Sequence, residues 1–166
     1  MAVPLRLLVF DACVLIDFAK ADTTILTLVS RHVGEVHVAT PVFEEVEDID
    51  PSMAASFGIK LYEPSLEIAA AAAATRGRLS FPDRLCLAIA KEEGWTCVSN
   101  DKQLRSHCAA EKVPVLWGFE VLALVVEARA LTPAAARDLA LQIAANNTRI
   151  GRQVLLRFFS RIGVKA

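Results

Sequence analysis

The sequence predicts a three-layer α/β/α fold built around a mostly parallel sheet of five strands. Short runs of β-branched and aliphatic residues recur as far as residue 117, and segments with helical composition or periodicity lie between them. Such alternation is typical of βαβ units, in which helices cover both faces of a parallel sheet. With 166 residues, of which 54% are hydrophobic, the chain is long enough for one domain with a sizeable core.

The predicted strands are short apolar runs, because strands buried on both faces read as nearly continuous apolar segments. They are LRLLVF (5–10), EVHVAT (35–40), IKLYE (59–63), TCVS (96–99) and VPVLW (113–117). The segments between them are predicted to be helices. They are 12–20, 41–49, 64–78, 83–93 and 102–112. Pro41 suits the first turn of its helix, and the Ala-rich segment closes at Gly77.

From Phe119 onward the pattern changes to three helical blocks with no convincing strand. We therefore expect residues 1–118 to form the α/β domain and residues 119–166 to form a helical C-terminal extension packed on the same domain. Thr132 suits the cap of the middle block. The last block, 149–162, is amphipathic and carries arginines on its outer side.

Composition says more about the cellular compartment of the protein than about its binding partners. The net charge of −1 gives no global reason to expect a polyanionic partner, but residues 149–166 contain five basic residues and no acid. A basic tail can mark a nucleic-acid or protein contact, although a solvated face is the more common meaning. The four cysteines lack metal-site spacing, and no apolar run is long enough to span a membrane. We expect a cytoplasmic protein with reduced thiols.

Acids from separate segments are predicted to meet at one edge of the sheet. Asp11 directly follows the first predicted strand, and Asp101 lies two residues after the fourth. Asp83 begins the helix that leads into the fourth strand, and Glu45 lies in the helix after the second. Functional groups of an open parallel sheet gather beyond the carboxyl ends of its strands. An all-oxygen set without His or Cys suits Mg²⁺ or Mn²⁺, ions that promote phosphodiester cleavage.

In their order and spacing, the segments VFDACVLIDF, TPVFEEV, LSFPDRLCLAIAKEEG and CVSNDKQL resemble the PIN domain, a fold of metal-dependent ribonucleases that includes VapC-type toxins. The resemblance implies a PIN-like domain over residues 1–118 and an endoribonuclease that uses Mg²⁺ or Mn²⁺. It assigns the catalytic and metal-binding roles to four acids, namely Asp11, Glu45, Asp83 and Asp101. For a toxin, it also implies a small antitoxin protein as partner and a homodimer.

Details of the motif refine this assignment. Glu45 is preferred over Glu44 as the second acid because an apolar residue, Val46, follows it. Ser99 is an accessory residue that could orient water or simply end the strand. Cys13 stands where the family usually has a small polar residue, so the hydrogen bond made at that position is absent or altered.

Structural explanations compete with these roles. An Asp at a helix start is often only a cap or a favourable charge in the first turn, and Glu45 belongs to an acidic run. The alternative to a nuclease is therefore a non-catalytic PIN-like module that binds nucleic acid or a partner. The cations that flank the predicted site are expected to contact RNA phosphates, and they are Arg84, Lys102 and Arg105. Asp17 is predicted to point away from the site as a surface or pairing acid.

Overall fold

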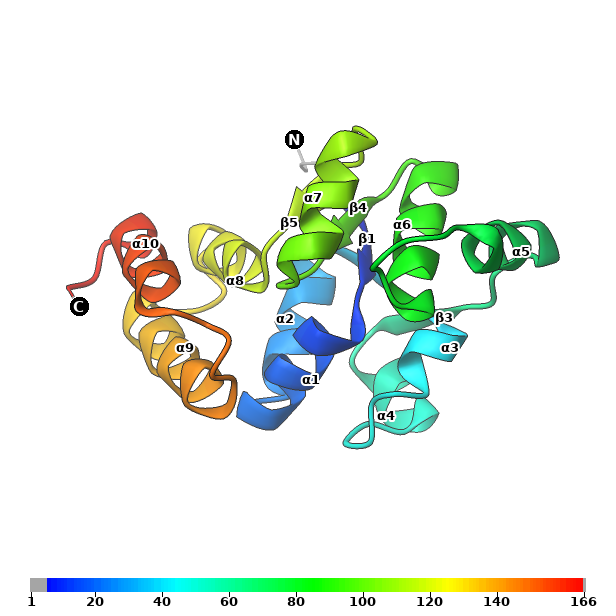
Figure 1. Cartoon of the computed structure of the whole chain (residues 1–166). Coiled ribbons are helices and arrows are strands. Elements are labelled where there is room, and N and C mark those ends of the chain that lie inside the picture. Colours follow the sequence, from blue (N-terminus) through cyan, green and yellow to red (C-terminus); the bar gives the residue numbers. More distant parts are fainter. Residues whose placement is uncertain (1–5, 166) are drawn as a thin grey trace.

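The computed structural model describes residues 6–165, and a sheet runs through its middle (Figure 1). Its five strands are all parallel, in the order β3-β2-β1-β4-β5. The strands are β1 (Arg6–Phe10), β2 (Gly34–Ala39), β3 (Ile59–Tyr62), β4 (Thr96–Val98) and β5 (Val115–Leu116). The predicted strands and the three-layer α/β/α fold are therefore confirmed.

Helices connect the strands and cover both faces of the sheet (Figure 1). One face carries the helices that link β1 to β3, namely α1 (Ala12–Ala21), α2 (Thr24–His32), α3 (Thr40–Phe43) and α4 (Pro51–Ser56). The opposite face carries those that link β3 to β5, namely α5 (Leu66–Ala74), α6 (Phe81–Glu93) and α7 (Lys102–Ala110). The helices change face once, because parallel crossovers are right-handed and the chain reverses its direction across the sheet after β3.

The centre of the sheet is a topological switch point. β1 pairs with β2 on one side and with β4 on the other, so α1 and α7 leave neighbouring strands toward opposite faces. The backbone N–H of Asp11 donates to the carbonyl of Val98 over 3.1 Å, which holds the carboxyl ends of the two strands together. Ligand sites of open α/β sheets form at such points.

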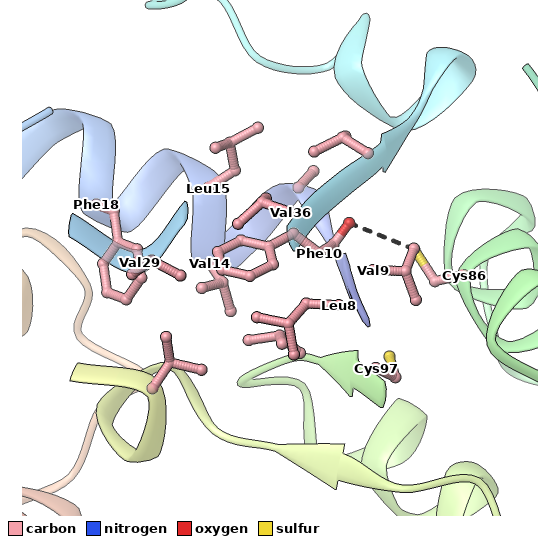
Figure 2. Packing of buried hydrophobic residues seen from close by; sticks show 14 of the residues in the cluster. Leu8, Val9, Phe10, Val14, Leu15, Phe18, Val29, Val36, Cys86 and Cys97 are labelled. Carbon is pink, nitrogen blue, oxygen red and sulfur yellow. Dashed lines mark hydrogen bonds between the residues drawn. The ribbon is translucent and has the colours of Figure 1, made fainter. Parts of the chain in front are cut away.

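The hydrophobic core lies on both sides of β1 (Figure 2). Leu8, Val9 and Phe10 are completely buried, and the Phe10 ring meets the edge of the Phe18 ring of α1 with centroids 6.3 Å apart. On the opposite face, the Cys86 thiol of α6 lies 3.8 Å from the carbonyl oxygen of Phe10. Packing on both faces fixes the end of β1, and with it the position of the next residue, Asp11.

Three further helices follow β5 and pack on the α1–α2 face. They are α8 (Gly118–Glu127), α9 (Pro133–Asn146) and α10 (Arg152–Ile162). α8 contacts α2, α9 contacts α1, and α10 closes over α8 and α9 (Figure 1). The buried rings of Phe119 and Phe158 lie 5.1 Å apart, and Arg161 pairs with Glu127 over 3.0 Å. No helix within residues 6–165 has the length and apolar character needed to cross a membrane.

The helix predicted over 41–49 is wrong beyond its first turn. α3 ends at Phe43, and turns carry the chain to Asp50, which caps α4 by accepting from the N–H of Met53 over 2.8 Å. The acids that follow α3 would place like charges three and four residues apart on a helix, which disfavours it. They are Glu44, Glu45, Glu47 and Asp48.

The last helix also starts later than predicted, and two helices are additional. α10 begins at Arg152 instead of 149, because the chain turns at Asn147, whose side chain accepts from the N–H of Arg149 over 3.1 Å. Arg149 is therefore not on the outer side of this helix. The sequence patterns did not predict α2 or α4, which lie outside the helical segments expected from the sequence.

Candidate active site

Asp11 is the most enclosed acid at the carboxyl edge of the sheet. Only 2% of its surface is exposed, because it follows β1 directly and begins α1. One carboxylate oxygen caps α1 by accepting from the N–H of Val14 over 3.0 Å. The other oxygen accepts from the hydroxyl group of Ser99. The capping role and the position at the predicted site are therefore combined in one residue.

Ser99 joins the ends of β1 and β4. Its side chain is fully buried, and while its hydroxyl donates to Asp11, its oxygen accepts from the N–H of Asp101 over 2.9 Å. Asp101 in turn caps α7, accepting from the N–H of Leu104 over 2.8 Å. A continuous hydrogen-bond chain therefore links Asp101, Ser99 and Asp11.

Asp83 reaches the same edge from α6. Ser80 caps this helix and accepts from the N–H of Asp83 over 3.3 Å, which leaves the half-buried carboxyl group in the first turn. α6 runs opposite to the strands, so its first turn lies at their carboxyl ends. Three of the predicted acids thus converge on one edge of the sheet.

The pKa of Asp11 responds to the other acids at this edge. Burial raises the pKa of Asp11 to about 7, hydrogen bonds from Ser99 and Val14 oppose that rise, and the charges of Asp83 and Asp101 add to it. Burial also raises the pKa of Asp83, with a contribution from Asp101. A raised pKa means that the negative charge is disfavoured at this position, and a bound cation would offset that cost.

Glu45 is placed differently. It lies in the turn after α3 and is exposed, as is Glu44 at the end of that helix. Its negative charge contributes to the raised pKa of the Cys86 thiol, which lies beneath β1. The structure therefore places Glu45 on the flank of the site, apart from the hydrogen-bonded chain that contains Asp11.

The acids at this edge supply only oxygen donors and do not form a closed metal cage. Within residues 6–165, no three His, Cys, Asp or Glu side chains are close enough together to hold a metal ion. Mg²⁺ usually retains several waters and is bound directly by only one or two carboxylates. Carboxyl groups that could serve such an ion at this edge are those of Asp11, Asp83 and Asp101, and the pKa values of Asp11 and Asp83 are raised.

Cys13 lies beside these acids on α1. Its exposed side chain is two residues beyond Asp11, where a small polar residue was expected from the family resemblance. Desolvation raises the pKa of Cys13 to about 12, and the neighbouring charges of Asp11, Asp17 and Asp83 contribute. The thiol is consequently neutral at physiological pH and is not an activated nucleophile.

The three predicted phosphate contacts differ in their freedom. Lys102 is exposed next to Asp101. Arg84 donates to the carbonyl of Thr75 and lines a cavity of about 210 Å³ between α5, α6 and α7. The Arg105 guanidinium lies 3.6 Å from the centre of the Trp117 ring, and its buried Nε has no hydrogen-bond partner among residues 6–165. Arg105 is thus committed to packing, whereas Lys102 can reach a ligand.

Asp17 is buried, with only 7% of its surface exposed, so of the two predicted roles that of a surface acid is wrong. The pairing role takes the form of hydrogen bonds to two side-chain amides. The Asp17 carboxylate accepts from the side-chain amide of Asn147 over 3.0 and 3.2 Å, and from that of Asn100 over 3.2 Å. No local signal identifies this network, because Asn147 lies 130 residues further along the chain.

A protein-family model described as a PIN domain matches residues 7–164, which include both the strand-rich part and the helices that follow it. None of the curated proteins matches the chain.

Proposed function

Because the chain belongs to the PIN domain family, whose members are generally metal-dependent nucleases, we propose that it is an endoribonuclease that uses Mg²⁺ or Mn²⁺ to hydrolyse RNA phosphodiester bonds. The observation that carries the proposal is that Asp11, Asp83 and Asp101 lie at helix starts by the switch point of the sheet, where Ser99 links Asp11 to Asp101 by hydrogen bonds. Two of these acids also cap helices, but capping alone does not explain why a buried carboxyl group lies among two other negative charges.

The proposed roles follow from the contacts of each residue. Asp11, Asp83 and Asp101 would hold the ion, and Glu45 would act from the flank. When bound, Mg²⁺ or Mn²⁺ supplies polarisation of the phosphoryl oxygen and a more acidic water. Ser99 would keep the Asp11 carboxylate fixed through its hydroxyl group.

Cations beside the acids would position the RNA backbone. Lys102 begins α7 directly after Asp101, and Arg84 follows Asp83 in α6. Phosphate contacts of this kind orient a strand without reading its sequence. We therefore propose that these two residues bind RNA, and that Arg105 supports the site through Trp117 instead.

The test is cleavage of a mixed-sequence single-stranded RNA with Mn²⁺ or Mg²⁺ and then with EDTA. Cleavage should require the metal and should fall by about 100-fold or more in Asp83→Asn protein, since losing even an outer-shell partner of a metal costs 10- to 100-fold. Asp138→Asn, in an exposed position of α9, is the matched control and should cleave normally. Cleavage that persists in EDTA, or equally in both variants, would contradict the proposal.

A binding module without catalysis is the second candidate. It is favoured by the open arrangement of the acids, since no three metal-binding side chains in the described chain share one ion site. It predicts that RNA binds with the same affinity with and without divalent metal and stays intact in both.

We further propose that this ribonuclease is the toxin of a toxin–antitoxin pair and acts as a homodimer in the cytoplasm. The support for this proposal is the resemblance of the motifs to VapC-type toxins and the four free cysteines, which suit a reducing compartment. Co-purification of a small partner from the native host, with inhibition of cleavage by that partner, would support the toxin role. A protein that purifies alone and whose expression leaves growth unchanged would contradict it.

A further inference from the structure

A cavity of about 410 Å³ lies between α1, the start of α7 and the turn that joins α9 to α10. Cys13 and Asp101 are part of its wall, so it adjoins the proposed active site. On another side it is closed by Asn147, Arg149 and Ile150, which belong to the proposed helical extension. Its size is that of pockets that take small organic ligands.

The lining combines two exposed cations with apolar surface, and the carboxylates of Asp17 and Asp101 complete it. Lys102 and Arg149 are both exposed, and neither forms an ion pair with any residue between 6 and 165. Ile16, Trp117 and Phe119 provide apolar and aromatic wall. Single-stranded RNA is held by this combination, since cations contact its phosphates and aromatic or apolar groups contact its bases.

A buried hydrogen-bond network around Asp17 holds the wall of the cavity that the helical C-terminal extension contributes. Asp17 accepts from the amide of Asn147, and the carbonyl oxygen of that amide accepts from the backbone N–H of Arg149 over 3.1 Å. Asp17 also accepts from Asn100, whose carbonyl oxygen takes the N–H of Gly118 over 2.9 Å. One buried carboxylate therefore ties α1, the loop before α7 and the α9–α10 turn together.

We propose that this cavity is the subsite for one nucleotide of the RNA strand beside the phosphodiester that is cleaved, with Lys102 and Arg149 at its phosphate. Asp17 also lines the cavity, and we assign it as a positioning residue because it holds Asn147 and, through it, the turn that carries Arg149. The inference rests on the proposed function and adds to it a substrate contact made by the helical extension.

The experiment measures binding separately from cleavage. Fluorescence anisotropy of a fluorescein-labelled, mixed-sequence single-stranded RNA is recorded with Asp83→Asn protein in Mg²⁺, alone and with Arg149→Ala or Arg152→Ala added. Arg149→Ala should weaken binding roughly three- to tenfold and reduce the salt dependence of log K by about 0.7. Arg152, exposed in the first turn of α10 and outside the cavity lining, is the matched control of equal charge. Arg149→Lys should restore part of the affinity.

A double-mutant cycle tests the positioning role. Asp17→Asn should weaken RNA binding, and adding Arg149→Ala to it should have much less effect than in the parent protein. A purely structural Asp17 would instead lower the thermal stability and leave the two effects on affinity additive, which would overturn its role.

The remaining outcomes separate this inference from the proposed function. Binding that depends on Arg149, in a protein that never cleaves RNA, would refute the nuclease and keep the subsite. Metal-dependent cleavage with equal effects of Arg149→Ala and Arg152→Ala would keep the nuclease and overturn the subsite. Tighter, Arg149-dependent binding of single-stranded DNA of the same sequence would overturn the assignment to RNA.

Discussion

Replacing Asp11 by Asn should stabilise the metal-free protein while abolishing cleavage. Burial raises the pKa of Asp11 from 3.8 to about 7, so ionising this carboxyl group costs the folded state free energy. At about 1.4 kcal/mol per pH unit, the cost is roughly 4 kcal/mol at pH 8. Asn keeps the helix cap and can donate to Ser99 without carrying charge. The variant is therefore expected to exceed the wild type in unfolding free energy at high pH.

The sign of the pH dependence follows from the raised pKa. Between pH 4 and pH 7 the folded state binds more protons at Asp11 than the unfolded state, so the contribution of this residue to stability falls as the pH rises. Roughly 2.5 kcal/mol of the cost should develop between about pH 5 and pH 8. Asp17 and Asp83 titrate in the same direction, but they are common to both proteins and cancel in the difference.

The assay is urea unfolding in EDTA at these two pH values, followed by tryptophan fluorescence. The difference in unfolding free energy between Asp11→Asn and wild type should grow with pH by the stated amount. A difference that is constant, or that shrinks with pH, would refute the claim that Asp11 is a buried carboxyl group held against other negative charges.

Three further predictions concern the metal, the serine and the arginine. Mg²⁺ at about 100 times its Kd should raise the unfolding free energy of wild type by about 2.7 kcal/mol and leave Asp11→Asn nearly unchanged; equal gains in calorimetry would contradict the site. Ser99→Ala should lower the unfolding free energy by about 2 kcal/mol at pH 8, because the Asp11 carboxylate loses a hydrogen-bond donor. The same loss should move the rise of the cleavage rate to higher pH, and an unaltered pH profile would speak against this contact. Arg105→Ala should lower the unfolding free energy by about 1 kcal/mol through lost stacking on Trp117. It should weaken RNA binding less than Lys102→Ala does, and the reverse order of affinities would count against Lys102 as the phosphate contact.

The parts of the site that are encoded locally could be predicted from the sequence. Asp11, Asp83 and Asp101 each stand at a helix start beside an apolar segment, and parallel strands bring such positions to one edge. The five strands could be recognised for the same reason, since each is a short apolar run. The positions of the three acids in the chain could be predicted because the strands and helices beside them have clear apolar patterns.

The parts that depend on distant contacts could not be predicted. The burial of Asp17 depends on Asn147, and the position of Arg105 depends on Trp117, which begins a different helix. Tertiary contacts decided both of these cases against the local pattern. The end of α3 differs, because it has a local cause: Pro41 suggests a helix that would include Glu45, whereas repulsion among the acids that follow α3 ends that helix early.

Asp11 has two roles, and this affects how activity can be inferred for related chains. The carboxylate that would serve an ion also caps the first turn of α1, so a related protein that no longer needs catalysis would still be under selection to keep a capping residue here. The least disruptive replacement is the amide, which preserves the anchor and relieves the buried charge. An Asn here would therefore be the signature of a protein that has abandoned chemistry but kept its shape, and an intact Asp is weaker evidence of catalysis than its placement suggests.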